Sequence, residues 1–395
     1  MNSNIPTPSQ SVRIASIDIF RAITMLCMIF VNDLWTLTDV PHWLEHAAPN
    51  EDFLGFSDIV FPSFLFVLGM SVPFAIENRI KKGESWLAIL KHILIRTIAL
   101  LIMGVFIVNT EAGISPASPI SLSFFILLMV TAFFLIWNVY PKTNGQKKYL
   151  YLGLQFMGII ILLCLAFTFR DVNNGAFRPR WWGILGLIGW AYLITALSYL
   201  IFRTNLIIQS IVLILLILLC FSGKEALLGL LRNVFGNGAL AAFSMSGMLI
   251  TLLIKKLSTQ ITIYKMCIIL MLIGILSLII SIIVHPYWII SKSLATPTWL
   301  FLCTGIALLF YVFIYWLADI KGKSNWFKIV GPAGTATLTC YLIPYLLYNL
   351  SRLLDFSLPE TILKCPSGLI KSILFAFLAI AITALLGKAR IKLKI

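Results

Sequence analysis

Charge is scarce in this sequence. Only 11% of the 395 residues are charged and 60% are hydrophobic, whereas a soluble domain carries about 25% charged and roughly 45–50% apolar residues. Apolar runs of about 18 residues recur along the chain, long enough for a helix to cross a bilayer core of about 30 Å. Strands are excluded for these runs because open sheet edges cannot be satisfied in lipid. The composition therefore predicts an all-α, polytopic transmembrane helix bundle.

Other common features are also absent. The seven cysteines are an odd number, and they show no disulfide or metal-binding spacing. Residues 1–12 are polar and lack a basic segment before a short apolar one, so we expect the first apolar segment to be retained rather than cleaved as a signal. There is no internal repeat and no low-complexity tract. We expect a polar tail over 1–12 and one transmembrane domain over 13–395.

The apolar runs predict about twelve spans, with ten as a lower bound. Proline and glycine lie mostly at the ends of the runs, where helices must stop. The run over 182–222 is broken only by a very short polar segment and predicts a tight helical hairpin. The predicted spans are 14–36, 58–77, 93–110, 120–140, 149–168, 182–202, 205–222, 238–254, 266–285, 298–317, 330–350 and 367–386.

Lysine and arginine set the expected orientation. Most of the 30 lysine and arginine residues fall on the segments that are cytoplasmic if the N-terminus is cytoplasmic, and cytoplasmic loops carry the excess of positive charge. We expect both termini on that side and the loop with His42 and His46 on the outer side. The net charge of +15 then reflects loops held against anionic headgroups rather than a nucleic-acid partner.

Polar residues are concentrated at the start of the first span, in the pattern Arg13, Ser16, Asp18 and Arg21. Such residues are costly in a membrane helix unless they are satisfied. One interpretation is an interface-anchored helix start, with Ser16 or Asp18 near the N-cap and Arg21 reaching the headgroups. The other is a collar that binds phosphate, because arginine offers forked donors to phosphate oxygens.

The loop between the first two spans holds much of the remaining chemistry. His42 and His46 are four residues apart and would share a helix face if residues 41–47 were helical. Two histidines at this spacing could bind a metal, but no third ligand is evident. The alternative is a general base, since carboxylates lie close to these histidines. Asp58 begins the second span, either as an N-cap or beside a polar cavity.

Three further features of the sequence are informative. Asn32 lies near the outer end of the first span and either bridges helices or stabilises an oxyanion. Trp299 is expected to be an interfacial anchor. The small residues of 331–341 suit close helix packing, and the hydroxyl groups in the same stretch could line a polar pocket.

Several segments together resemble one family. The chain looks like the heparan-α-glucosaminide N-acetyltransferase group of transmembrane acyltransferases, and in particular like bacterial members of uncharacterised-domain type. The resemblance is strong over 13–110 and 238–350, and 182–222 looks like an extra helix pair. The segments that carry it are RIASIDIFRA (13–22), MIFVN (28–32), LEHAAPNEDFLGFSDIVFPSFLFVLG (44–69), KSLATPTWLFLCTGIALLFYVFIYWLADIKG (292–322) and, more loosely, GPAGTATLTCY (331–341).

The resemblance implies acetyl transfer across a bacterial inner membrane. Acetyl-CoA would be the cytoplasmic co-substrate, no metal would be needed, and the acceptor would be an amino sugar or glycan on the outer side. The family's active histidine corresponds to His46, which would act as a base or carry the acetyl group. Asn32 would stabilise the oxyanion, and Asp58 would orient His46. The remaining expected residues are Arg13, Ser16, Asp18, Arg21 and the basic loop 79–96 for the donor, and Asp33, Glu45, Asn50 and Lys292 for the acceptor.

The sequence also departs from the family pattern. Ala22 replaces a glycine, Ala336 replaces an asparagine, and residues 119–124 lack a Gln-Arg pair. The loop over 49–52 is slightly longer than in the family, and we expect it to determine the acceptor. Two alternatives follow: a sugar or lipid-linked glycan transporter, which predicts internal repeats and broken helices, and an inactive glycan-binding relative. A homodimer is the default expectation for the assembly.

Overall fold

The computed structural model describes residues 15–116, 118–141, 145–222 and 234–395, and the predicted polar tail over 1–12 lies outside this part of the chain. The described residues form helices and loops with no strand, so the predicted all-α fold is confirmed. The long helices are α1 (Ala15–Asp33), α2 (Ser57–Lys81), α3 (Trp86–Glu111), α4 (Leu122–Trp137), α5 (Gln146–Thr168), α6 (Ile184–Phe202), α7 (Leu206–Ser222), α9 (Ala239–Leu257), α10 (Ile263–Val284), α11 (Pro297–Tyr315), α13 (Thr337–Leu353) and α15 (Ser367–Lys388). The shorter helical segments are η1 (Leu34–Thr36), η2 (His42–Leu44), η3 (Trp316–Ile320), η4 (Ser324–Val330), α12 (Gly331–Thr335) and α14 (Glu360–Leu363).

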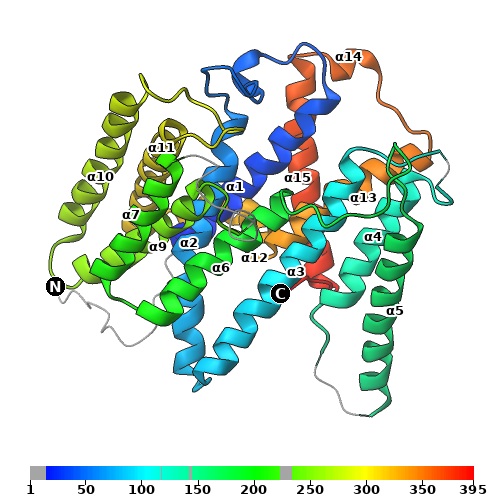
Figure 1. Cartoon of the computed structure of the whole chain (residues 1–395), viewed down its shortest axis with the longest axis horizontal. Coiled ribbons are helices and arrows are strands. Elements are labelled where there is room, and N and C mark those ends of the chain that lie inside the picture. The colour runs from blue at the N-terminus through cyan, green and yellow to red at the C-terminus, as the bar shows by residue number, and fades with distance from the viewer. Residues whose placement is uncertain (1–14, 117, 142–144, 223–233) are drawn as a thin grey trace.

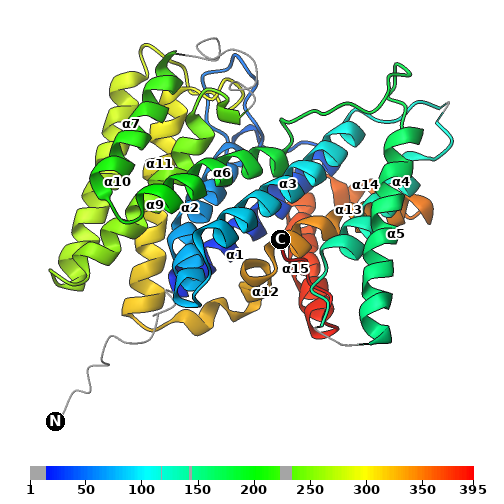
Figure 2. The same cartoon turned by 60° about the horizontal axis from the view of Figure 1, so that its bottom comes forward.

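The helices form a central group with a wing on either side. Figures 1 and 2 both show α1, α2, α3, α6 and α15 in the middle, α7, α9, α10 and α11 on one side, and α4 and α5 on the other. Large apolar side chains on α5 and α10 are exposed, as expected for helices that face lipid. The central helices are therefore the ones that position internal polar groups.

In the described part of the chain, nine helices are long and apolar enough to cross a membrane. The helices α4 and α7 are apolar but shorter, and together these account for eleven of the predicted spans. The remaining predicted span, 330–350, is not one continuous helix. The segments 324–335 and 337–353 meet at an angle of 75°. Ala336 separates them in a non-helical conformation, with φ −129° and ψ 47°.

The helices α2 and α9 approach closely because each has a glycine at the contact. A Cβ atom on Gly69 would lie 1.7 Å from the carbonyl oxygen of Ser244, and one on Gly247 would lie 1.9 Å from that of Phe66. Only hydrogen fits in either space, so the two backbones pack directly against each other. This contact fixes α2, whose first turn carries Asp58.

The bundle has two ends that differ in chemistry. The helix α1 runs from Ala15 at one end to Asp33 at the other, and α2 returns from Ser57 to Lys81. We call the end with the loop between these helices the His46 end, and the opposite end the cavity end. The start of α1 lies at the cavity end, where the carboxylate of Asp319 accepts hydrogen bonds from the backbone N–H groups of Ala15 and Ser16 at 3.1 Å each. Ser16 and Asp18 lie in the first turn of α1, as the first interpretation expected, and a carboxylate from another segment accepts hydrogen bonds from the free N–H groups of that turn.

Candidate functional site

The loop at the His46 end contains little helix. Its single turn is the 3₁₀ helix η2, His42–Leu44, so the condition under which His42 and His46 would share a helix face is not met. The His42 ring instead pairs with Glu51, with Nε2 3.0 Å from Oε1, and packs 4.5 Å from the ring of Phe53. No cluster of three metal-binding side chains occurs among the residues described by the structure.

His46 and Asp58 are in direct contact. The Nδ1 atom of His46 lies 2.7 Å from Oδ1 of Asp58. The His46 side chain is 50% exposed, whereas that of Asp58 is only 2% exposed. A carboxylate accepts the Nδ1 proton and thereby leaves the lone pair on Nε2, which is the arrangement of an oriented general base. The pair thus presents a basic nitrogen to the surroundings while its carboxylate is buried.

The Asp58 side chain is held in place by the loop itself. Its Oδ2 accepts hydrogen bonds from the backbone N–H groups of Ala47, at 3.0 Å, and Gly55, at 3.2 Å. It does not cap α2, because neither donor belongs to that helix. A Cβ atom on Gly55 would lie 1.8 Å from the carbonyl oxygen of Glu45. Only glycine therefore allows the two sides of the loop to close around this carboxylate.

The first turn of α2 is anchored from α11. The indole Nε1–H of Trp299 donates to the carbonyl oxygen of Asp58 at 3.1 Å, and the Trp299 side chain is buried. The expectation that Trp299 is an interfacial anchor is wrong. Its large ring packs in the core against Phe243, with the ring centroids 5.0 Å apart. The backbone that carries Asp58 is thus fixed by a residue 241 positions away in the sequence.

Lys292 completes the charged group. Its Nζ lies 3.1 Å from Nδ1 and 3.4 Å from Nε2 of His46, and 3.9 Å from Oδ1 of Asp58. Burial lowers the pKa of the Lys292 ammonium, and the nearby Asp58 carboxylate partly opposes this effect. The structure therefore brings the predicted Lys292, His46 and Asp58 together, with a cation beside the exposed edge of the imidazole.

A second contact docks this loop on the segment between α10 and α11. The carboxylate of Asp52 accepts a hydrogen bond from the Ile290 backbone N–H at 2.8 Å, and Nε2 of His285 lies 2.8 and 3.0 Å from its two oxygens. The Ile290 N–H, followed by His285, lowers the pKa of Asp52. The Ser291 hydroxyl donates to the carbonyl oxygen of Pro49 at 2.8 Å. These contacts hold Lys292 beside His46.

Asp33 does not lie in this charged group. It is fully buried and accepts hydrogen bonds from Tyr348 (2.5 Å), Ser372 (2.6 Å) and Lys371 (2.8 Å). These contacts tie α1 to α13 and α15. Asn32 is half-buried, and its side chain makes no hydrogen bond within the described ranges. It therefore retains a free amide near the His46 end.

Two other predicted acceptor residues are exposed. Glu45 and Asn50 both lie on the surface of the loop, and only the Glu45 backbone carbonyl contacts the site, through Gly55. Among the predicted donor residues, Arg13 lies outside the described residues. Ser16 is buried beside Tyr311, with the two hydroxyl oxygens 3.4 Å apart.

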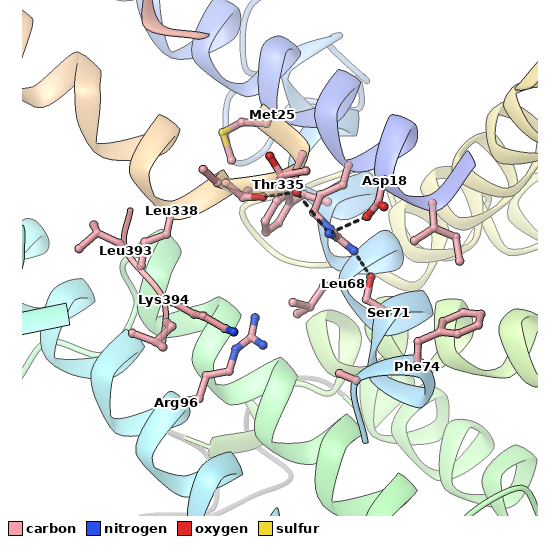
Figure 3. A pocket seen from close by; sticks show the side chains of 18 of the residues that line it. Asp18, Met25, Leu68, Ser71, Phe74, Arg96, Thr335, Leu338, Leu393 and Lys394 are labelled. Atoms are coloured by element: carbon pink, nitrogen blue, oxygen red, sulfur yellow. Dashed lines mark hydrogen bonds and ion pairs between the residues drawn. The ribbon is translucent and has the colours of Figure 1, made fainter. Parts of the chain in front are cut away.

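A cavity of about 1480 Å³ opens at the other end of the bundle (Figure 3). We call the part of the cavity farthest from His46 its lower part and the part nearest to His46 its upper part. The lower walls contain Asp18, Arg21 and the hydroxyl-bearing Thr335 and Thr337, as the second interpretation of 331–341 predicted. The Arg21 guanidinium donates to Asp18 and to the carbonyl oxygen of Gly334 at 3.3 Å each, and to the Ser71 hydroxyl. Arg21 is thus already engaged by protein acceptors that join α1 to α2 and α12.

The upper walls of the cavity are apolar and approach the His46 end. They include Met25 and Met28 of α1 and Phe64 and Leu68 of α2. Along α2, Phe64 lies six residues from Asp58, or about 9 Å at the helical rise of 1.5 Å per residue. The cavity therefore runs from a polar lower end to an apolar upper end, close beneath the charged group.

Sequence reasoning missed several of these groups. Trp299, Asp319 and Gly55 each act through a partner distant in sequence or through a backbone contact, and no spacing of residues signals these pairings. The link between Asp52 and His285 had one available signal, since both are titratable residues in polar loops expected on the same side of the membrane.

The fold and these two sites define a multi-pass integral membrane protein with an oriented histidine at one end and a deep cavity at the other. Residues 13–177 match the family model described as heparan-alpha-glucosaminide N-acetyltransferase, catalytic. This match confirms the predicted resemblance over residues 13–177. Residues 238–350, where the sequence also predicted a strong resemblance, lie outside the match.

Two curated relatives carry the same name. The chain is 28% identical to heparan-alpha-glucosaminide N-acetyltransferase of Mus musculus over 191 residues, which cover 45% of this chain and 25% of the mouse protein. It is 33% identical to the Homo sapiens protein of that name over 107 residues, which cover 27% of this chain and 15% of the human protein. The chain therefore matches about a quarter or less of the length of these relatives.

Proposed function

We propose that the protein is a membrane acetyltransferase that moves an acetyl group from cytoplasmic acetyl-CoA to an amino sugar or glycan at the His46 end, which faces outward. The observation that carries this proposal is the contact of 2.7 Å between His46 and the buried Asp58. It makes Nε2 of His46 a directed base. The family match over residues 13–177 supports the reaction class, and the predicted charge bias supports this orientation in the membrane. The bacterial plasma membrane is part of the proposal because the resemblance implies it.

In the proposed reaction, His46 takes a proton from the acceptor amine or hydroxyl as that group attacks the thioester carbonyl. A new N–C or O–C bond forms, and the C–S bond of the donor breaks. CoA leaves as a thiolate, which receives the proton from His46. Lys292 lies close enough to the imidazole to stabilise negative charge on the tetrahedral intermediate. The free amide of Asn32 is a second candidate for that role.

The cavity supports the donor half of the proposal. Its apolar upper part suits the pantetheine arm and its polar lower part suits the nucleotide. Met28 lies four residues from Asn32 along α1, about 6 Å at the helical rise. A donor filling the cavity would thus hold its thioester near the level of the charged group.

The test is acetyl transfer by the purified protein with acetyl-CoA and a panel of amino sugars and glycans. The His46→Ala variant should lose activity by roughly 10²–10⁴-fold, the usual contribution of a general base. His42→Ala is the matched control, because it removes a neighbouring loop histidine that pairs with Glu51 instead. Full activity in His46→Ala would contradict the proposal.

The bent pair of helices at the cavity favours a second function, sugar transport, because broken helices line many transporter sites. A transporter predicts uptake of labelled glucosamine into sealed vesicles that contain no acetyl-CoA. The acetyltransferase predicts no uptake and an acetylated product outside vesicles that are loaded with acetyl-CoA.

A further inference from the structure

Arg96 is an arginine within an apolar helix. It lies ten residues after the first residue of α3, about 15 Å along the helix, and it lines the cavity. Its guanidinium rests 4.5 Å from the centre of the Tyr192 ring, and its Nε is buried without a hydrogen-bond partner. It forms no ion pair with any residue that the structure describes. An arginine inside a membrane-spanning helix is energetically costly, and such residues usually have a functional role with a polar or charged partner.

The chain segment after α15 forms the facing wall of the cavity. This extended segment is held by backbone hydrogen bonds: the Lys394 N–H donates to Trp137 at 3.0 Å, and the Val139 N–H donates to Lys392 at 3.0 Å. The Leu393 N–H donates to the buried Thr339 hydroxyl at 3.0 Å. Figure 3 shows the Lys394 and Arg96 side chains pointing toward one another across the cavity. These hydrogen bonds therefore hold the segment in a defined position on the cavity wall.

The cavity has a large excess of positive charge. Of its two acidic side chains, Asp18 pairs with Arg21, and Glu77 pairs with Lys255 and accepts from Tyr199. Four of the other lysine and arginine side chains on the lining form no ion pair with an acidic side chain that the structure describes. Like charges gathered in a partly desolvated space repel one another, so an anion bound among them would be strongly favoured. These four are Lys81, Arg96, Arg390 and Lys394.

We propose that Arg96 and the basic side chains of 390–394 form a cradle for the phosphate groups of a nucleotide-bearing donor. The proposal rests on the proposed function. It keeps Arg96 from the predicted basic loop 79–96 and assigns the phosphates to this cradle instead of the predicted collar. Arg21 is engaged by three protein acceptors, so it shapes the cavity wall. Arg96 offers a forked set of donors suited to phosphate oxygens, and the lysines add point charges around it.

The test measures binding by the full-length protein in nanodiscs of neutral lipid. CoA is compared with pantetheine, which has the same thiol arm and no phosphate. Arg96→Gln should weaken CoA binding by about tenfold or more, the effect of losing one charge-assisted contact, and should leave pantetheine binding unchanged. Arg96→Lys should restore part of the affinity, and Lys394→Gln should show a smaller loss. Lys256→Gln is the control, since Lys256 is exposed at the same end of the bundle and does not line the cavity.

The outcomes separate this proposal from the proposed function. Equal losses of CoA and pantetheine binding in Arg96→Gln would assign Arg96 a structural role and overturn the cradle. If acetyl transfer occurs and CoA affinity is unchanged in Arg96→Gln and Lys394→Gln, the cradle is wrong and the proposed function stands. If CoA binding depends on Arg96 and no acetyl transfer occurs, the cradle stands and the proposed function fails. In nanodiscs with anionic lipid, a loss of lipid retention in Arg96→Gln with unchanged CoA affinity would identify a headgroup site and overturn the donor cradle.

Discussion

The two ends of the bundle differ in how their charged side chains are paired. At the His46 end, each acidic side chain of the site meets a basic partner within hydrogen-bonding distance: Asp58 meets His46, and Asp52 meets His285. At the cavity end, four basic side chains on the lining form no ion pair with an acidic side chain in the described part of the chain. Paired charges hold their side chains in a fixed geometry, whereas an excess of positive charge attracts an anionic ligand. The first end is therefore built to orient a reacting group, and the second to bind an anion.

The largest effect should come from neutralising the charge that orients His46. Asp58→Asn keeps the shape of the side chain and loses its charge, so the imidazole is no longer held in the required tautomer. We expect acetyl transfer to fall by roughly 10²–10⁴-fold, with CoA affinity unchanged because the cavity lies at the other end. Steady-state kinetics and CoA titration measure the two effects separately. A parallel loss of CoA affinity would show that the two ends are not independent.

A third charged group provides a comparison in which charge serves the fold alone. Asp33 is fully buried and is paired with Lys371 at 2.8 Å. Lys371→Met leaves this carboxylate with only its two hydroxyl donors, and breaking such a pair costs about 3–5 kcal/mol. We expect a large drop in the free energy of unfolding, measured by denaturant titration in detergent. The Lys371→Met protein that remains folded should bind CoA normally. If this folded protein bound CoA more weakly than the wild type, the donor site would extend to α15.

The sequence predicted the fold well because apolar length alone identifies membrane helices. It also identified His46, Asp58 and Lys292 from short motifs, although their roles as a group are still proposals. The contacts that orient them could not be predicted in this way. Trp299 and Asp319 act on helices more than 200 positions distant in sequence, and such contacts depend on how helices pack. An isolated tryptophan near a span end is ordinarily interpreted as an anchor.

The donor residues show the same limit. Arg21 is a residue type that commonly binds phosphate. However, the packing of α12 against α1 supplies the Gly334 carbonyl oxygen that accepts a hydrogen bond from it. The break at Ala336, where the sequence had suggested one continuous helix, creates that packing. The residues of 390–394 had no local pattern beyond positive charge. Only the folded chain brings them to the cavity.

A smaller effect should follow from widening the loop that encloses Asp58. In Gly55→Ala the added methyl group would lie 1.8 Å from the Glu45 carbonyl oxygen, so the loop must move and the contact between His46 and Asp58 must lengthen. We expect kcat to fall by about tenfold, the value of roughly one hydrogen bond, with unchanged CoA affinity. Gly153→Ala is the control, because nothing lies within 4 Å of its added carbon. Normal kcat in Gly55→Ala would show that the loop adapts without cost to the site.

The smallest effect concerns the contact that docks the His46 loop on the segment before α11. The Ile290 N–H and His285 lower the pKa of Asp52, so the ionised carboxylate is the form that the folded protein favours. The stability that the ionised Asp52 contributes to this contact is fully present above the ordinary aspartate pKa of about 3.9. It is lost as the pH falls through the lowered pKa of Asp52. Hydrogen exchange of residues 46–56 measures it. At pH 6 the wild type should be better protected than Asp52→Asn, and the two should converge as the pH falls below the ordinary aspartate pKa. Asp39→Asn, which removes an exposed pair with Lys364, should match the wild type throughout. Equal protection in wild type and Asp52→Asn at pH 6 would show that other contacts hold the loop, and the paired charge of this end would then matter only at His46.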